Sequence, residues 1–238
     1  MRLFFYISLL IILITVSCTK EENKRTEYIK LNSFDKILVN STFDIYLIED
    51  TCESIEINAN EDLIKNISHT VTDGRLILDN STAYKWLNPK ENQIDIYIHY
   101  QKLSLVELNQ TCHLQTINPI KSESFGLILK SKTNWASLDL ECNSFYYWNN
   151  FPCGGKLSLK GRVSNLKIWN FAILTVDAKG LLAKRAVVEN HSQSDCTVNV
   201  SERLEYSIMN SGNIYLYGNP SQIKEGEISA SGRLIRTK

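Results

Sequence analysis

The chain has 238 residues, of which 43% are hydrophobic and 22% are charged, so it is long enough for one substantial hydrophobic core. Its 26 Lys and Arg residues balance its 26 Asp and Glu residues, which gives no electrostatic reason to expect nucleic acid or an acidic lipid surface as a partner. With only 4 Pro and 10 Gly, the composition does not favour long disordered stretches.

The first residues have the composition of a targeting segment. Arg2 supplies a positive end, and Leu3 to Val16 form an uncharged apolar run that is too short to span a bilayer comfortably. Ser17 is the small residue that signal cleavage requires. We therefore predict a signal peptide over residues 1–17, with a plain secretory signal or an uncleaved N-terminal anchor as the alternatives.

The string TVSC at the end of this segment resembles the lipobox of bacterial lipoproteins, in which signal peptidase II cuts before a cysteine that carries acyl chains such as palmitate. Thr15 departs from the usual pattern, where Leu is common three residues before the cysteine. The resemblance predicts that Cys18 is the lipidated N-terminus of the mature chain. The acyl chains would hold the protein to a membrane, which we expect to be the outer membrane of the cell envelope.

A charged segment without apolar periodicity follows, and we interpret residues 18–27 as a tether. Within it, Lys20-Glu21-Glu22 resembles the signal that sends some lipoproteins of the Bacteroidetes to the cell surface. A solvated linker has the same composition. The sequence therefore leaves the cell surface and the periplasmic face of the membrane equally open.

Alternating apolar residues predict strands through the first third of the domain. They are Ile37/Val39, Phe43/Ile45/Leu47, Ile55/Ile57, Leu76/Leu78 and Ile94/Ile96/Ile98. TDGRL, residues 72–76, predicts a turn between two strands, and NEDLIKNI, residues 60–67, predicts one short helical turn. Because no Pro-rich or Ser-rich linker interrupts the chain, we predict one continuous all-β domain over residues 28–238.

A repeat of about twenty residues organises the second half. Six units share the pattern apolar–x–apolar–x–polar, with spacings of 21, 19, 20, 20 and 20 residues between their polar members. The polar members are Gln110, Ser131, Asn150, Asn170, Asn190 and Asn210. Each unit predicts a short strand, because its apolar residues alternate with a period of two.

Polar residues at fixed spacing, joined by loops of variable length, are typical of stacked coils. We predict a parallel β-helix with coils of about 20 residues, whose strands pair about 4.8 Å apart around a shared interior. A hexapeptide solenoid with an eighteen-residue coil fits the spacing worse. We interpret the recurring polar residues as a structural ladder of hydrogen bonds at the strand ends. A row of ligands for a sugar or a metal is the alternative.

Aromatic residues supply the candidate ligand-binding site. The repeat places Tyr147 and Trp169 on the outer side of their strands, Phe151 and Phe171 directly after the ladder position, and Trp135 in the preceding coil. Such a face could stack on sugar rings or bury against a partner protein. Loops could equally cover these side chains, and the two phenylalanines could stack inside the corner.

Three segments resemble the putative auto-transporter adhesin, head GIN-domain family, a domain of unknown function carried on lipoproteins of the Bacteroidetes. They are FDKILVNSTFDIYLIED, INANEDLIKNISHTVTDGRLIL and MNSGNIYLYGNP. The resemblance runs from about Tyr28 to Ser231 and implies a right-handed β-helix with a pectin-lyase-like outline and no established catalytic residues. Where Ser-Gly corners are frequent in the family, this chain has WNNFP, WNFA and NHSQ.

The sequence offers little support for catalysis. The outward positions of the repeated strands hold no cluster of carboxylates, and the four histidines have no metal-ligand spacing. No Ser nucleophile elbow, phosphate-binding Gly loop or Cys-x-x-Cys pair is present. Five cysteines follow Cys18, an odd number, so at least one is unpaired or intermolecular.

We therefore expect a non-catalytic lipoprotein of the cell envelope, without a cofactor or a bound metal. Its function would be adhesion or ligand binding, with a glycan or a surface protein as the partner. An envelope enzyme that acts on polysaccharide through a site built from loops is the alternative, as is a structural envelope protein with no dedicated ligand.

Overall fold

Apolar and polar residues alternate along most of the chain, and this alternation favours strands because it places every apolar side chain on one side of an extended backbone. The computed structural model describes residues 24–82, 93–149 and 152–237. Its elements, in chain order, are β1 (Lys24–Lys30), β2 (Lys36–Val39), β3 (Asp44–Glu49), β4 (Ser54–Asn60), α2 (Glu61–Ile64), β5 (Ile67–Thr72), β6 (Arg75–Asn80), β7 (Asp95–Tyr100), β8 (Leu105–Leu108), β9 (His113–Thr116), β10 (Ile120–Leu129), β11 (Thr133–Asn149), β12 (Gly154–Ser192), β13 (Cys196–Ile208), β14 (Ile214–Tyr217), β15 (Gln222–Ile228) and β16 (Leu234–Arg236).

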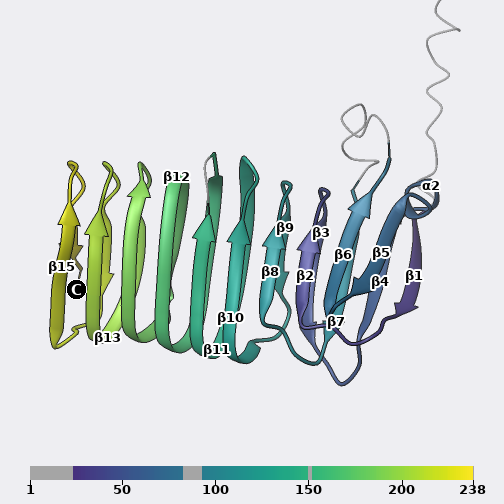
Figure 1. The fold of residues 1–238 in the computed structure, drawn as a ribbon, viewed down its shortest axis with the longest axis horizontal. Coiled ribbons are helices and arrows are strands. Elements are labelled where there is room, and N and C mark those ends of the chain that lie inside the picture. The colour runs from purple at the N-terminus through teal and green to yellow at the C-terminus, as the bar shows by residue number, and fades with distance from the viewer. Residues whose placement is uncertain (1–23, 83–92, 150–151, 238) are drawn as a thin grey trace, which may run out of the picture.

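The strands stack as successive coils of a β-solenoid, which extends from the N-terminal strands to β15 and β16 at the opposite end (Figure 1). Neighbouring coils pair in parallel, as β8 does with β10, β10 with β11, and β11 with β12. The solenoid has about six turns with a repeat near 21 residues. The predicted single-domain parallel β-helix is thus confirmed.

Each coil crosses two faces of the solenoid, because its chain turns a corner between two runs of strand. The first face consists of β3, β9, residues 133–140 of β11, residues 154–161 and 174–178 of β12, residues 196–199 of β13, and β14. The second face consists of β2, β8, residues 125–129 of β10, residues 144–149 of β11, residues 165–170 and 185–190 of β12, residues 203–208 of β13, and β15.

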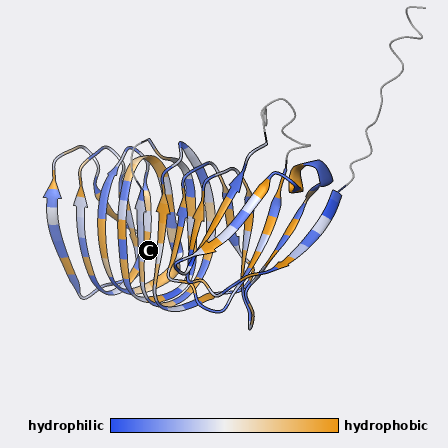
Figure 2. Cartoon of the chain, turned by 45° about the vertical axis from the view of Figure 1, so that its right-hand side comes forward, coloured by the Kyte–Doolittle hydropathy of each residue, from blue (hydrophilic) through white to orange (hydrophobic). Residues whose placement is uncertain are grey.

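The hydrophobic core fills the space between the two faces. Along each strand apolar and polar residues alternate, as the bands of Figure 2 show, and the apolar ones point inward. Equivalent residues of successive coils stack: Leu127 pairs with Tyr147, and Tyr147 pairs with Ile168. The rings of Phe125 and Phe145 stack in the same way, with centroids 5.7 Å apart. Burial of such columns is the main stabilising contribution to a solenoid.

One coil is shifted by a single residue relative to the repeat that the sequence predicts. Its inward side chains are Phe145, Tyr147 and Asn149, each at most 1% exposed. Because strand side chains alternate with a period of two, a shift of one residue exchanges the inner and outer sides. The prediction that Tyr147 points outward is therefore wrong. Residues 145–148 read Phe-Tyr-Tyr-Trp, so both alternating sets are aromatic and the phase is ambiguous.

Buried asparagines line one edge of the interior, at the ends of the strands of the second face. Asn149, Asn170 and Asn190 are each 0% exposed. The amide of Asn170 donates to Oδ1 of Asn190 and to the carbonyl of Leu174, at 3.2 and 2.8 Å. Asn149 donates to the carbonyl of Phe171 and accepts from its backbone N–H. These amides satisfy backbone groups where the strands turn, as buried polar groups must.

The other predicted ladder positions behave differently. Asn150 lies outside the described residues, and Asn149 occupies the buried position of that coil. Gln110 is exposed and lies in a bend after the end of β8, so its assignment to the ladder is wrong. Ser131 is buried and hydrogen-bonds to the hydroxyl of Thr111 at 2.9 Å. Asn210 is partly exposed and donates to the carbonyl of His191 at 3.2 Å.

The two ends of the solenoid are built differently. At the N-terminal end, β4 pairs antiparallel with both β1 and β7, and β5 pairs antiparallel with β6. Asp73 and Gly74 have positive φ in the β5–β6 turn, as a tight hairpin requires, so the predicted turn is confirmed. The helical turn predicted near residue 60 is α2. Strand β1 begins at Lys24, so the fold includes the last residues of the segment expected to be a tether.

Candidate functional site

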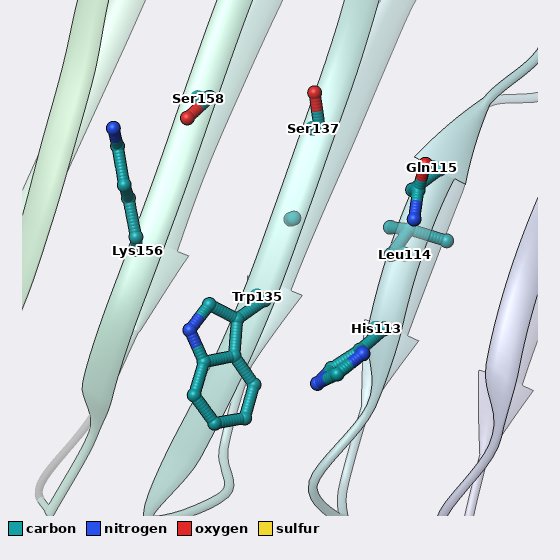
Figure 3. A pocket seen from close by; sticks show the side chains of 8 residues that line it. His113, Leu114, Gln115, Trp135, Ser137, Lys156 and Ser158 are labelled. Atoms are coloured by element: carbon teal, nitrogen blue, oxygen red, sulfur yellow. The ribbon is translucent and has the colours of Figure 1, made fainter.

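A shallow depression of about 480 Å³ lies on the first face, across strands β9, β11 and β12 (Figure 3). Its outward-pointing residues occupy matching positions on three adjacent strands: His113, Trp135 and Lys156 form one row, and Gln115, Ser137 and Ser158 form the next. Side chains at equivalent positions of adjacent parallel strands lie side by side, because the strands are in register. The stacking of coils therefore assembles the depression from three segments about twenty residues apart.

Trp135 is the dominant apolar surface of the depression. It is 45% exposed, although a tryptophan is usually among the more buried residues. The ring of His113 packs against it in a T-shaped arrangement, with centroids 4.7 Å apart and an interplanar angle of 84°. Nδ1 of His113 in turn lies 3.2 Å from Oδ1 of Asp44 on β3. The indole ring is thus supported from one side by a histidine that a carboxylate orients.

Polar groups surround this ring. Gln115, Ser137 and Ser158 supply an amide and two hydroxyls along the second row. Nζ of Lys156 lies 3.4 Å from Oδ2 of Asp177 in the next coil, and both side chains remain about half exposed. An exposed indole beside several hydrogen-bonding groups can stack on an apolar ring face while its neighbours bind polar substituents.

The aromatic surface continues on the neighbouring strands of the same face. Tyr46 on β3 is in register with Gln115, and its ring stacks on that of Tyr97 on β7, with centroids 4.6 Å apart and an interplanar angle of 14°. Burial, followed by the nearby carboxylate of Asp95, raises the pKa of Tyr46. Tyr46 is therefore a neutral hydrogen-bonding phenol at physiological pH, and its stacked ring extends the platform beside the depression.

Asp44 is paired in register with Asp95 on one side and with His113 on the other, so two carboxylates lie side by side next to the histidine. Burial raises the pKa of Asp95, and the proximity of Asp44 acts in the same direction. Nε2 of Gln93 donates to Oδ2 of Asp44 at 3.1 Å. Among the residues that the structure describes, no three His, Cys, Asp or Glu side chains are grouped to hold a metal ion.

The family model for the putative auto-transporter adhesin, head GIN domain, matches residues 33–220. The chain belongs to this family. The match confirms the resemblance seen in the sequence, and the family description, an adhesin head, points to a cell-surface or envelope protein. No curated protein matches the chain.

Solved structures share the fold of this GIN domain. A putative adhesin from Bacteroides fragilis NCTC 9343 is 17% identical with a TM-score of 0.79, and the match covers 91% of this chain and 98% of that one. A putative lipid binding protein from Parabacteroides distasonis ATCC 8503 is 17% identical with a TM-score of 0.64, over 92% and 98% of the two chains. A putative adhesin from the same organism is 12% identical with a TM-score of 0.64, over 91% and 98%.

The GIN domain does not bring the five aromatic residues of the predicted binding site together. Trp135 lies in the depression on the first face, whereas Trp169 is a partly exposed residue of the second face. Phe171 follows Trp169 at the corner, where its ring stacks on that of His191 at 4.4 Å. Tyr147 is inside the core, and Phe151 lies outside the described residues. The predicted continuous aromatic face is therefore wrong.

The second face of the GIN domain carries aromatic residues that the repeat missed. Trp148 is in register with Trp169, and both are partly exposed. Tyr146 is also partly exposed, and its ring lies over Gly126 of the preceding coil, where an added Cβ would come within 2.1 Å of the ring. The glycine was the one signal in the sequence, because a residue without a side chain leaves room for a large neighbour.

Among the residues that the structure describes, no helix is both long and apolar enough to cross a membrane.

Proposed function

We propose that this GIN-domain protein is a lipid-anchored, non-catalytic component of the cell envelope that binds carbohydrate through the depression on its first face. The single observation that carries the proposal is the exposed indole of Trp135, held by His113 among hydroxyl, amide and ammonium groups. A sugar ring has an apolar face and an equatorial rim of hydroxyls. An aromatic ring flanked by hydrogen-bonding side chains complements both features.

The shape of the site supports binding of one segment of a longer chain. The depression is shallow and open along the row of Gln115, Ser137 and Ser158, and it continues toward the stacked rings of Tyr46 and Tyr97. A polysaccharide could lie across successive coils with several sugar units in contact. We propose this mode rather than catalysis, because the described residues that line the depression include no carboxylate.

We further propose that acyl chains on Cys18 hold the domain to the outer membrane. The motif TVSC and the apolar run before it support this assignment. Only a short charged segment separates Cys18 from β1, which begins at Lys24. Mass spectrometry of the wild type should find acyl chains on Cys18 and no residues 1–17, whereas replacement of Cys18 by Ser should abolish acylation and leave residues 1–17 attached. Protease treatment of intact cells would then distinguish the surface from the periplasmic face.

A glycan array tests the binding site. The soluble form should begin at Thr19, because β1 pairs along its whole length with β4 and must be retained. Selective binding of glycans should be lost in Trp135→Ala and retained in Trp169→Ala, a matched control that removes a tryptophan from the second face. We expect affinity to fall at least about tenfold in the first variant, as truncation of an aromatic anchor typically costs more than 1 kcal/mol.

Three results would contradict the proposal. Equal binding by Trp135→Ala and wild type would exclude the depression as the site, and a blank array would direct the search toward protein partners. Release of new reducing ends from a bound glycan would show that the protein is an enzyme.

A further inference from the structure

The C-terminal end of the solenoid presents an unpaired strand edge. Strand β15 is paired through one edge to β13, and no described strand pairs with its other edge (Figure 1). Most of its residues are exposed, and Ile228 is 40% exposed although it lies at the end of a column of buried isoleucine and asparagine side chains. The N-terminal end differs, because antiparallel strands are added beyond the parallel coils there. An open edge is a template for another strand.

The sequence of β15 is complementary to itself when it is read in the opposite direction. If the midpoint between Glu225 and Gly226 lies on a two-fold axis, an antiparallel pair of β15 strands places Ile223 opposite Ile228 and Lys224 opposite Glu227. Two-fold symmetry requires antiparallel pairing and produces each of these contacts twice. Opposite residues of an antiparallel pair have their side chains on the same side of the sheet.

A bulge in β15 gives both members of the Ile223/Ile228 pair, and both members of the Lys224/Glu227 pair, the same orientation. The register with β13 shifts between Tyr206 and Ile208, so that Ile208 is paired with Ile228 one residue later than a regular strand would place it. Ile223 packs against the core, and Ile228 continues the column of buried Ile208. Both isoleucines are therefore inward, and in a regular strand they would lie on opposite sides.

The outward residues match as well. Lys224 is paired in register with the outward Glu205, its Nζ lies 2.8 Å from Oε1 of Glu205, and its side chain is 62% exposed, so it can reach a second carboxylate. Gly226 has no room for a side chain, because a Cβ would lie 2.4 Å from Oγ of Ser207. Glu225 is paired with the buried Tyr206 and points inward, where its carboxylate accepts a hydrogen bond from the hydroxyl of Tyr206. The centre of the pair therefore carries no side chain on the outward side, where Gly226 lies.

We propose that a second copy of this chain pairs with β15 about this two-fold axis, to give an end-to-end dimer in which the second faces form one continuous sheet. A lysine and a bulge on an edge strand ordinarily discourage pairing with arbitrary strands. Here the lysine meets a glutamate and the bulge aligns the isoleucines, so the same features select one partner, namely an identical strand. The dimer covers the exposed apolar side chains and satisfies the free backbone groups of both edges.

The two-fold arrangement of the dimer would also affect carbohydrate binding; this consequence rests on the proposed function. A two-fold axis that lies along the sheet normal leaves the first faces of both copies directed to the same side. The two Trp135 depressions would then be available to one polysaccharide at the same time, which raises the overall affinity through effective concentration.

Cysteine cross-linking of the full-length chain in membranes tests the dimer. In a Cys52→Ser background, which removes the exposed thiol, Lys224→Cys combined with Glu227→Cys places two thiols opposite each other across the axis. Residues directly opposite on antiparallel strands have Cβ atoms about 5 Å apart, close to the distance of a disulfide. We expect a covalent dimer that is at least about fivefold more abundant than in either single-cysteine variant.

The single-cysteine variants are matched controls, because each lacks a facing thiol. Equal yields of dimer in the double and single variants would overturn the proposal, and so would a covalent product of the double variant with a different protein. The result is independent of the glycan array, so failure of the dimer and failure of the proposed function are distinguishable.

Charge reversal gives a second readout. Lys224→Glu should convert the detergent-solubilised protein from dimer to monomer in sedimentation velocity, and Lys224→Glu with Glu227→Lys should restore the dimer because the two charges are exchanged. Circular dichroism of each variant checks that the strands are retained. A monomeric wild type, or the same mass for all three proteins, would contradict the proposal.

Discussion

The amide of Asn170 donates a hydrogen bond to Oδ1 of Asn190, the equivalent residue of the next coil, over 3.2 Å in the interior of the solenoid. Asn190 also donates to the carbonyls of Ser194 and Gly212, at 3.3 and 3.0 Å. The Asn190 side chain therefore connects three successive coils, through the side chain of Asn170 and the backbone carbonyls of Ser194 and Gly212. Such a residue stabilises the stack because the groups it satisfies are buried and have little access to water.

Replacement of Asn190 by Ala should lower the free energy of unfolding by about 2–3 kcal/mol, because it leaves buried carbonyls and the amide of Asn170 with fewer partners. Denaturation by urea measures the change. Asn199→Ala is the matched control, since Asn199 donates to one carbonyl, that of Lys179, at the exposed surface. It should cost less than about 1 kcal/mol. Equal losses in the two variants would argue against a stabilising role for the buried column.

Two glycines at the same corner of adjacent coils should differ in their tolerance of alanine. Gly161 has φ of +104°, and a Cβ there would lie 2.2 Å from the carbonyl oxygen of Leu140. Gly180 has no positive φ, and its closest contact would be Cβ of Lys160 at 3.2 Å. Gly161→Ala should therefore cost about 1–3 kcal/mol and Gly180→Ala less than about 1 kcal/mol, measured as shifts of the urea midpoint. Similar midpoints would contradict this difference.

The hydroxyl of Tyr147 is buried and has no hydrogen-bond partner among the described residues. Burial raises the pKa of Tyr147 well above its usual value. Tyr147→Phe removes the unsatisfied hydroxyl and keeps the ring, so stability should be unchanged or higher, whereas Tyr147→Ala should cost about 3–5 kcal/mol through the cavity it leaves. Thermal unfolding followed by circular dichroism compares the variants. A substantial loss in Tyr147→Phe would reveal a partner for the hydroxyl.

The buried thiols should make the fold sensitive to alkali. Burial raises the pKa of Cys112 and of Cys196 from 9.0 to about 12, and that of Cys142 to about 11. The unfolded chain releases these protons at lower pH than the folded one. The contribution to stability is thus fully present below pH 9.0 and is lost as the pH rises through the raised values. Urea midpoints measured from pH 8 to about 11 should fall, and Cys196→Ala should reduce the slope.

Alkylation of native protein near pH 8 provides a separate check, because thiol reactivity requires access as well as ionisation. Cys52 is exposed, whereas Cys112, Cys142, Cys153 and Cys196 are buried. Iodoacetamide should modify Cys52 rapidly and modify the other four only after denaturation. Rapid modification of all five in the native protein would show that the interior opens readily.

Much of the architecture was predictable from the sequence, because it depends on local periodicity. Alternation of apolar residues marked the strands around Ile37, Ile45 and Ile96, and each is present where it was expected. The turn at Asp73-Gly74 and the helical turn of α2 were also visible, since they rest on short-range backbone preferences. A regular repeat then indicates stacked coils, because identical spacing lets each coil bury its apolar side on the next.

The phase of individual coils was not predictable in the same way. In the Phe-Tyr-Tyr-Trp run of residues 145–148, either alternating set could face the core. Register with Phe125 and Leu166 in the adjacent coils selects Phe145 and Tyr147 as the inner pair, and this selection is a tertiary effect. Tyr147 was correspondingly misassigned to the surface, because one residue of shift exchanges the core and the surface.

The sequence by itself therefore determined that this chain forms stacked β-coils after an apolar N-terminal run and Cys18, since period and composition are local properties. Only the tertiary structure decided that His113, Trp135 and Lys156 are neighbours, that Trp169 lies on a different face, and that β15 ends the stack with an open edge. The physical reason is that the sites on a solenoid are rows across coils. The register between strands decides which residues share a row, and packing and corner geometry set that register only when the chain folds.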